Sequence, residues 1–540
     1  MRVLLVYPEL PPSFWSLPQA IRFSSAKALV APLAPLTVAA LLPEEWEIRF
    51  VDCNVKKITE QDWDWADAVM ISGMTVQRAG FQNIIKRGKE RGLLTIVGGP
   101  FPSLMAEELL KYGCDIVFQG EIENTTHLLL EAIRSGKRGH IVLNDDKPDL
   151  TATPLPRYDL VNIHDYKGFL LQTARGCPYR CEFCDIAGLY GSRSRYKSPD
   201  QVIEELELLF LTGARGVILI ADDNFIGNRK NAKAICEELI KWNRKHHQPF
   251  SFMTQASINL GQDMEMIDLM TAANFSEIFI GIESPEDDIL IANEKHQNVR
   301  NPPLESVENI KKNGLSVIGS FILGFDNEKK GAGKRICEFA DQSHIPTVMI
   351  NLLSAVAGTK LLERLQKENR ISDDMLQFHS GEFFINLPNF HPTRPLEEII
   401  EEYVEAYEYL YEPRRFFERA YKFCLAIRPT RKATATANGT LAQDKTPPTI
   451  PPSLRRQFDD IIGFFAFSWK HGIVASHRWQ YWKQLYGMRK RNPSRLKKYI
   501  VHCVSGDNLM ALSKTIRNDM KLLMEARERL LAEHSSRVED

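Results

Sequence analysis

The chain has 540 residues, with 68 Lys and Arg against 69 Asp and Glu, so its formal net charge is −1. Hydrophobic residues make up 44% and charged residues 25%, which is typical of a globular protein of several domains and excludes a largely disordered or fibrous chain. The near-zero net charge gives no reason to expect binding to nucleic acid or to an anionic membrane surface, so we expect no nucleic-acid partner. No apolar run is long enough for a transmembrane segment and the amino terminus reads as a buried strand rather than a signal peptide, so we expect a cytoplasmic protein.

Residues 1–144 alternate short apolar runs with helical patterns. Such alternation predicts a Rossmann-like, doubly wound parallel sheet of class α/β, with strands at Val3–Val6, Glu47–Val51, Ala68–Ile71, Leu94–Val97 and Asp115–Phe118. No G-x-G-x-x-G follows the first strand, so we do not expect a nicotinamide or flavin dinucleotide site. The loops after the later strands are rich in Gly, Ser and Thr, and strand ends of this kind are where the fold binds ligands.

Residues 145–168 are polar and contain several prolines, which predicts a linker. Residues 169–390 then repeat a strand–helix unit six times. The strands are expected at Phe169–Thr173, Gly216–Ile220, Phe250–Gln255, Glu277–Ile282, Leu315–Leu323 and Thr347–Ser354. Six such units predict a partial (β/α)6 barrel, whose active site would lie at the carboxyl ends of the strands.

Residues 391–540 have helical periodicity and predict a helical carboxyl-terminal domain. Within it, residues 433–452 are rich in Thr, Ala, Asn and Pro. This composition predicts a flexible surface loop. Tyr403, Tyr407 and Tyr411 follow a helical spacing that is typical of packing residues.

Three of the nine cysteines lie close together, directly after the first barrel strand. Cys177, Cys181 and Cys184 form a C-x3-C-x2-C motif. Thiolates suit iron–sulfur clusters and zinc, but a structural zinc site normally needs four ligands. Three thiolates on a four-iron cluster would leave one iron open to a small molecule. The alternatives are a zinc site completed by a distant histidine, or clustering by chance.

The stretch Arg175-Gly176-Cys177-Pro178-Tyr179-Arg180-Cys181-Glu182-Phe183-Cys184-Asp185 resembles the motif of the radical S-adenosylmethionine (SAM) superfamily. The resemblance implies a [4Fe–4S] cluster held by the three cysteines and SAM chelated to the open iron. It also implies cleavage of SAM to a 5′-deoxyadenosyl radical, with electrons from a donor such as flavodoxin or ferredoxin. Such cofactors carry the difficult chemistry while the protein binds and shields them.

Polar residues and a glycine at later strand ends also match the superfamily's pattern. By this resemblance, SAM would be bound by Ala221, Asp222, Asp223, Gln255, Ser257, Glu283, Ser284 and Gly319. Asp222 and Asp223 would hold the methionine amino group, and Glu283 the ribose. The alternative for these carboxylates is to cap the helix that follows each strand.

A Rossmann-like domain ahead of such a barrel resembles the cobalamin-binding class of the superfamily. The resemblance implies that cobalamin inserts among the strand-end loops and contacts Ser72, Gly73, Met74, Thr75, Gly98, Gly99, Gly120 and Glu121. The D-x-H-x-x-G motif that supplies a histidine to cobalt is absent, so we expect no histidine ligand. Alternatively, the domain has lost cobalamin and serves as a scaffold or substrate cover.

Phe14-Trp15-Ser16 and Trp65-Ala66-Asp67 are similar to a subgroup related to hopanoid C-methylases. The resemblance implies a cobalamin-dependent methyltransferase that acts on an unactivated carbon of a small molecule, lipid-like in this subgroup. Two other functions stay open: radical oxidation, cyclisation or rearrangement without methyl transfer, and a cluster-bearing redox sensor without catalysis. The sequence assigns no catalytic side chain.

The cysteine motif yields a first prediction. Anaerobic reconstitution should give an oxygen-labile four-iron cluster, because an open iron is exposed to small oxidants. Replacing Cys177, Cys181 and Cys184 together by alanine should abolish iron and sulfide binding, measured by metal analysis and absorption spectroscopy. Retention of iron and sulfide by this triple variant would refute the assignment.

Overall fold

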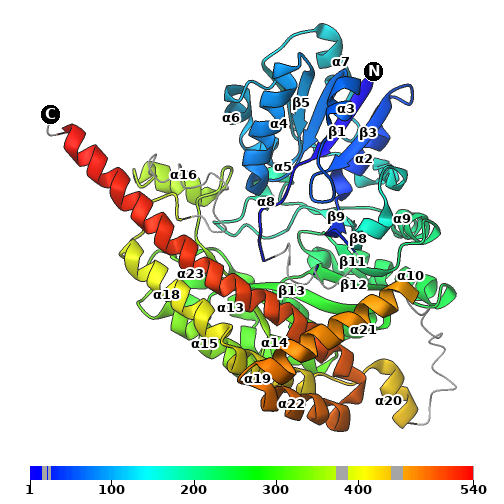
Figure 1. The fold of residues 1–540 in the computed structure, drawn as a ribbon, viewed down its shortest axis with the longest axis vertical. Helices are drawn as coiled ribbons and strands as arrows, with labels where there is room; N and C mark the ends of the chain where they lie inside the picture. The colour runs from blue at the N-terminus through cyan, green and yellow to red at the C-terminus, as the bar shows by residue number, and fades with distance from the viewer. Residues whose placement is uncertain (15–20, 22–25, 372–386, 439–453, 539–540) are drawn as a thin grey trace.

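The computed structural model describes residues 1–14, 21, 26–371, 387–438 and 454–538. Trp15 and Ser16, part of the similarity to the methylase subgroup, lie outside these ranges. Two parallel sheets and a helical carboxyl-terminal region make up the chain (Figure 1). None of the helices in the described ranges has the length and apolar character needed to cross a bilayer.

The first sheet has six parallel strands in the order β3-β1-β4-β5-β6-β7. The five predicted strands are confirmed; their bounds are β1 (Arg2–Tyr7), β3 (Glu47–Asp52), β4 (Ala68–Ser72), β5 (Leu94–Gly98) and β6 (Ile116–Gln119). The sixth, β7 (His140–Leu143), pairs with β6 and was not predicted, because only three apolar residues follow its histidine. The helices are α2 (Leu33–Leu41), α3 (Glu60–Trp65), α4 (Arg78–Glu90), α5 (Pro100–Leu104), α6 (Ala106–Lys111) and α7 (Thr126–Ser135).

The second sheet is the predicted barrel, a curled half-barrel of parallel strands in the order β15-β14-β13-β12-β11-β8-β2. The six predicted strands are confirmed as β8 (Tyr166–Leu171), β11 (Gly216–Ile220), β12 (Phe250–Gln255), β13 (Phe275–Glu283), β14 (Ser316–Leu323) and β15 (Thr347–Leu352). Its helices are α9 (Pro199–Leu211), α10 (Arg229–Lys245), α11 (Met264–Ala272), α12 (Asp287–Ala292), α13 (His296–Arg300), α14 (Pro303–Lys312), α15 (Ala332–Ser343) and α16 (Lys360–Lys367).

The seventh strand of this sheet comes from the start of the chain. β2 (Ala28–Ala31) pairs in parallel with β8, although the neighbouring β1 and β3 belong to the first sheet. The hydroxyl of Tyr166 on β8 also donates a hydrogen bond of 3.0 Å to buried Asp52 at the end of β3. The amino-terminal part of the chain is therefore joined to the barrel through both backbone and side chains.

The carboxyl-terminal helices pack beside the barrel, and the long helix α23 runs diagonally across the molecule (Figure 1). They are α18 (Leu396–Leu410), α19 (Pro413–Ala426), α20 (Arg431–Ala437), α21 (Leu454–Trp469), α22 (Arg478–Arg491) and α23 (Leu496–Val538). A π-helical turn (Lys470–Val474) follows α21.

Two tyrosines, one on α18 and one directly after it, form hydrogen bonds with the backbone of the last barrel strand. The hydroxyl of Tyr407 accepts from the amide of Ile350 at 3.1 Å and donates to its carbonyl at 3.0 Å. The hydroxyl of Tyr411 bonds in the same way to the amide and carbonyl of Val348. These side chains satisfy backbone groups of β15 that an edge strand leaves unpaired. The tyrosines at helical spacing are thus buried packing residues, as predicted.

The prediction of a flexible loop at 433–452 is wrong for residues 433–437. Residues 433–437 form the end of α20, which begins after Thr430, whose side chain accepts from the amide of Ala433. A threonine cap and an alanine-rich sequence both favour a helix. Residues 439–452 lie outside the described ranges.

Candidate cofactor site

The three cysteines lie in a loop closed by a short two-stranded ribbon. β9 (Ala174–Arg175) pairs with β10 (Arg195–Tyr196) in antiparallel fashion, with Arg175 opposite Arg195. We call residues 174–196 the cysteine hairpin. Gly176 follows β9 with a φ of +89°, and a Cβ there would lie 2.9 Å from the carbonyl oxygens of Gly191 and Arg193. Only glycine fits at this close approach of the two ends of the hairpin, which we call its neck.

The hairpin is held in place by α16 and by the residue that follows α12. The amide of Glu182 donates to the carbonyl of Asn293 at 3.2 Å, and its own carbonyl accepts from Leu361 at 3.0 Å. Its carboxylate forms an ion pair of 2.6 Å with Arg364 on α16. Glu182 stands between two of the motif's cysteines, so these bonds fix where the thiols lie.

The cysteine thiols are half-buried and form no disulfide with one another. Burial raises the pKa of Cys184 to about 12, so its thiolate needs a metal cation or another positive charge. Burial also raises the pKa of Cys177. The buried ammonium of Lys295 interacts electrostatically with Cys181 and Cys184, and the amide of Gln297 lies 3.6 Å from the sulfur of Cys181.

The three thiols suit an iron–sulfur cluster, whose cysteines each bind a different iron. In the described residues, no three His, Cys, Asp or Glu side chains converge on one metal position. Three soft donors on one loop beside a buried cation are compatible with an anionic cluster.

Asp222 and Asp223 follow β11 and bind the backbone that leads into the hairpin. Asp222 is fully buried, and its carboxylate accepts from the amides of Thr173 at 2.7 Å and Ala174 at 2.9 Å. Asp223 accepts from the amide of Gly176 at 2.7 Å. Burial raises the pKa of both carboxyl groups to about 6. Asp222 is thus committed to the backbone, while Asp223 also faces the cavity described below.

Glu283 and Ser284 lie at the end of β13, close to the cysteines through Lys295. Glu283 has a φ of +67°, and its carboxylate is paired with Lys295. Ser284 accepts from the amide of Glu286 at 3.1 Å, in a turn just ahead of α12. Both side chains are buried.

Three further predicted SAM residues are Gln255, Ser257 and Gly319. Gln255 is exposed at the end of β12, and Ser257 bonds to Asn224 and Asn259. A Cβ at Gly319 would lie 3.3 to 3.4 Å from Ile282, Ile345 and Phe321. The absent side chain of Gly319 therefore points into the packed core, and packing explains this glycine without a ligand.

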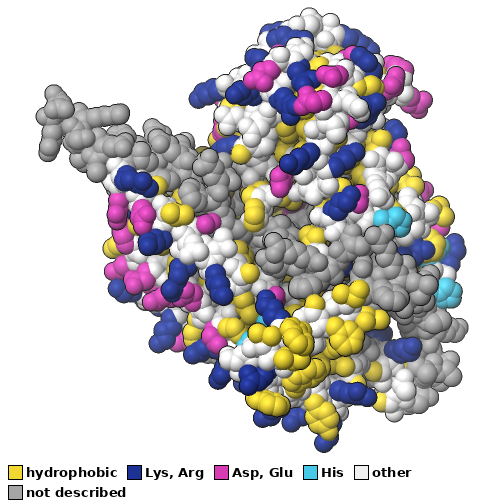
Figure 2. All heavy atoms as spheres, in the orientation of Figure 1, with side chains coloured by type: hydrophobic (Ala, Val, Ile, Leu, Met, Phe, Trp, Pro, Cys, Tyr) yellow, Lys and Arg dark blue, Asp and Glu magenta, His cyan; other side chains and the backbone are white. Residues whose placement is uncertain are grey.

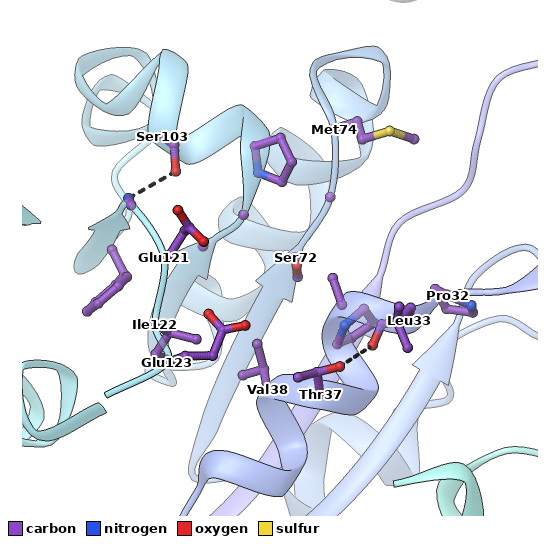
Figure 3. Close-up of a pocket in the computed structure, with 18 of the residues that line it drawn as sticks. Pro32, Leu33, Thr37, Val38, Ser72, Met74, Ser103, Glu121, Ile122 and Glu123 are labelled. Atoms are coloured by element: carbon purple, nitrogen blue, oxygen red, sulfur yellow. Dashed lines mark hydrogen bonds between the residues drawn. The ribbon is translucent and has the colours of Figure 1, made fainter. Parts of the chain in front are cut away.

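One cavity of about 400 Å³ lies between the carboxyl ends of the two sheets. From the first sheet it is lined by Ser72, Gly73, Met74, Gly98, Gly99, Gly120 and Glu121, and from the barrel by residues that include Leu170, Gln172, Arg175, Ala221 and Asp223. Thr75 is the predicted cobalamin residue that does not line it. Figure 3 shows Ser72 and Glu121 across from α2, which adds Leu33, Thr37 and Val38.

The cavity walls are mostly apolar. They include Leu5, Met70, Ile96, Phe118 and Leu129, and no histidine is among the described lining residues. A Cβ at Gly98 would meet nothing closer than 3.9 Å. Packing therefore does not explain this glycine, whereas close approach of a ligand to the backbone would. At Gly120, by contrast, a Cβ would lie 2.0 Å from the carbonyl of Asn144.

Two arginines at the neck of the hairpin bind carboxylates of the first domain. Arg175 contacts Glu121 at 2.8 Å and Glu123 at 2.6 Å. Arg195 binds both oxygens of Glu121, at 2.7 and 3.0 Å. The carboxylates are only 4 to 5% exposed. Glu121 therefore joins the hairpin to the loop after β6 rather than standing free for a ligand.

Sequence reasoning did not assign Arg175, Arg195 and Glu123 to the site, and it missed α2. Arg175 stands in the quoted motif, and a cation at the end of a buried strand signals a buried partner. Residues 33–38 gave no such signal, because an apolar helix start is typical of ordinary packing.

The chain matches known families along most of its length. Residues 21–130 match a B12 binding domain, and residues 171–340 match the Radical SAM superfamily. Residues 359–521 match a domain of unknown function, DUF4070.

Several known proteins are similar to the chain. An uncharacterized methyltransferase of Synechocystis sp. is 40% identical, with 96% of this chain and 93% of that protein covered. Hopanoid C-2 methylase of Rhodopseudomonas palustris is 33% identical, with coverages of 81% and 82%. A structure of the cobalamin-dependent SAM radical enzyme OxsB with aqua-cobalamin bound shares the fold, with a TM-score of 0.57 at 16% identity and coverages of 98% and 80%.

The contacts of Asp222 predict that it positions the hairpin rather than binding SAM. Asp222→Asn keeps an oxygen for the amides of Thr173 and Ala174, so the variant should keep wild-type iron content and SAM affinity. Asp222→Ala leaves buried amides without an acceptor and should lower the free energy of unfolding by about 1–3 kcal/mol. Iron analysis, calorimetric SAM titration and urea unfolding measure these effects, with Asp223→Asn as the matched variant that faces the cavity.

The raised pKa of Asp222 adds a pH test of the same prediction. A folded-state pKa of about 6 lies above the ordinary value of 3.8, so the folded protein takes up a proton before the unfolded chain does. The contribution of Asp222 to stability therefore grows as the pH falls through 6, and Asp222→Asn should remove that growth. A tenfold loss of SAM affinity in Asp222→Asn with iron intact would instead assign Asp222 to SAM.

The buried arginine pair predicts a second stability effect. Arg175→Met leaves Glu123 buried and unpaired, which should cost about 3–5 kcal/mol of unfolding free energy. Adding Glu123→Gln should recover part of this loss, because the stranded charge is removed. Breaking the exposed pair between Arg157 and Asp159 by Arg157→Met should cost less than about 1 kcal/mol. Equal losses in Arg175→Met and Arg157→Met would contradict the role of the buried pair.

Proposed function

Because the chain belongs to the radical SAM family that carries an amino-terminal B12 binding domain and includes hopanoid C-2 methylase, we propose that it transfers a methyl group to an unactivated carbon of a small molecule. The matched domains imply the cofactors. The radical SAM domain implies a [4Fe–4S] cluster and SAM, and the B12 binding domain implies cobalamin. We further propose a lipid-like substrate. The mostly apolar cavity walls and the similarity to a methylase of hopanoids support this class.

The observation that carries this proposal is the cavity shared by the two sheets. Strand ends of the B12 binding domain form one wall, and Gln172, Ala221 and Asp223 of the barrel form part of the other. The carboxyl ends of parallel strands are where each fold places its ligand. A cavity common to both would bring the two cofactors and a substrate together.

We propose that Cys177, Cys181 and Cys184 hold the cluster, and that Asp223 and backbone groups after β11 hold SAM. The loops after β4, β5 and β6 would hold cobalamin, with Gly98 allowing close approach. When bound, the cluster and SAM supply a radical able to remove hydrogen from an unactivated carbon, and cobalamin supplies the methyl group. We propose four segments: a cobalamin-binding domain at 1–144, a linker at 145–168, the radical SAM barrel at 169–390 and a helical region at 391–540.

The side chains of this site orient and shield rather than transfer protons. Lys295 places a buried positive charge beside Cys181 and Cys184, which favours the thiolate forms. Arg175 and Arg195 join the hairpin to the first domain through Glu121, and Arg175 also lines the cavity. Exclusion of water protects reactive species from side reactions.

We also propose that the protein works in a reducing environment with an electron donor. Thiolates that bind a cluster must stay reduced, and cleavage of SAM requires one electron for each radical. A cytoplasmic location and a donor such as flavodoxin or ferredoxin would meet both needs.

Labelled SAM tests the proposed function. The reconstituted, reduced enzyme should convert SAM to 5′-deoxyadenosine and place a CD3 group from CD3-labelled SAM on a carbon of a hopanoid or related lipid. Mass spectrometry of lipid products measures the transfer, with the triple cysteine variant as control. Formation of 5′-deoxyadenosine with an unmethylated, oxidised product would contradict methyl transfer and favour another radical reaction.

A further inference from the structure

The carboxyl-terminal helices expose a continuous set of large apolar side chains. In Figure 2 these hydrophobic side chains gather in the lower part of the view, over α21 and α22. Trp479 is 75% exposed and Phe465 is 67% exposed. We call the set the aromatic face; it consists of Ile461, Ile462, Phe465, Trp469, Ile473, Val474, Trp479, Trp482 and Tyr486.

The aromatic face follows the helical repeat on both helices. Ile461, Phe465 and Trp469 are spaced four residues apart on α21. Trp479, Trp482 and Tyr486 are spaced three and four residues apart on α22. In a globular protein such a stripe normally packs against the core, but here it is exposed.

The core contacts of these helices come from their other faces. Phe467 on α21 and Tyr481 and Met488 on α22 are at most 1% exposed. The helices are therefore packed against the rest of the protein, and the aromatic face is a second apolar surface. Exposed apolar patches of this kind mark interaction sites.

The turn between the two helices is fixed in place. Lys470 and His471 both bind Asp507 of α23, at 2.6 and 3.1 Å. The indole nitrogen of Trp482 donates to the carbonyl of Gly472 at 2.8 Å. These bonds hold the aromatic face as a preformed surface.

The segment that carries most of this face has charges of one sign, although Asp459 and Asp460 precede it on α21 and Asp507 of α23 pairs with Lys470. Between Ile461 and Lys498 the chain has nine Lys and Arg and no Asp or Glu, although the whole chain has a net charge of −1. The exposed cations of this segment include Lys470, Arg478, Lys483, Arg489, Lys490 and Arg491. The surface therefore complements an anionic partner.

We infer that the aromatic face binds the surface of an anionic lipid bilayer. Tryptophan and tyrosine are favoured at the headgroup level of membranes, and amphipathic helices with a cationic rim lie in that interface. The long basic side chains can extend toward lipid headgroups. This inference goes beyond the proposed function, since vesicle binding requires neither cofactors nor methyl transfer.

A lipid surface fits better than a second protein chain. The cores of protein–protein interfaces are depleted of lysine. In a symmetric dimer, the same surface of each copy meets its counterpart, so the two cationic segments would face each other. Like charges across an interface disfavour such pairing.

Vesicle sedimentation tests the inference with the full chain. The protein should bind vesicles of phosphatidylcholine with phosphatidylglycerol more tightly than phosphatidylcholine alone, and salt should weaken the binding. Brominated lipid should quench tryptophan fluorescence. Replacing Phe465, Trp469 and Trp479 together by serine should weaken binding about a hundredfold or more.

A charge variant separates the ionic contribution from the apolar one. Replacing Arg478 and Lys483 by glutamate should weaken binding to the anionic vesicles about tenfold or more. The matched control replaces Leu143 and Leu211 by serine, since these side chains are 56% and 72% exposed outside the aromatic face. This control should bind vesicles as the wild type does.

Three results would overturn the inference. The first is no binding to either kind of vesicle, and the second is equal binding by the wild type and the triple serine variant. The third is self-association of the wild type, measured by analytical ultracentrifugation, that the triple variant abolishes, because a second copy would then occupy the face. None of these results would bear on methyl transfer, which labelled SAM tests separately.

Discussion

The buried ion pairs between Arg175, Arg195, Glu121 and Glu123 are the constraint on which the site depends. The two arginines stand opposite each other where the cysteine hairpin begins and ends, and the carboxylates come from the loop after β6 of the first sheet. A buried charge is costly unless it is paired. Neither element can leave the other without exposing or stranding these charges, so the hairpin and the first domain are held as one site.

The walls of the cavity follow from this arrangement. The carboxyl ends of both sheets line it, and α2 closes one side. β2, directly ahead of α2, is part of the barrel sheet, so the segment that supplies this wall is anchored to the barrel. Domains joined only by a flexible linker would not define such a cavity. Here backbone pairing and buried ion pairs both hold the walls.

The carboxyl-terminal helices use opposite faces for different purposes. Tyr407 and Tyr411 bind the edge of β15 and stabilise the last strand of the half-barrel. α21 and α22 pack through residues such as Phe467 and Tyr481, while their outer faces carry exposed aromatic and basic side chains. One side of this region thus completes the edge of the half-barrel, and the other side carries an exposed surface for interaction.

The sequence alone determined the strands that were predicted in both sheets, because apolar runs bounded by turn residues carry a local signal. It also determined the cysteine motif, whose spacing is local. Tertiary structure decided what depends on residues far apart in the chain. It turned Asp222 toward the backbone of Thr173 and paired Glu121 and Glu283 with cations. It also placed β2 in the barrel and left Trp469 and Trp479 exposed. A side chain's partner is chosen by packing across the whole fold, and no local pattern in the sequence contains that information.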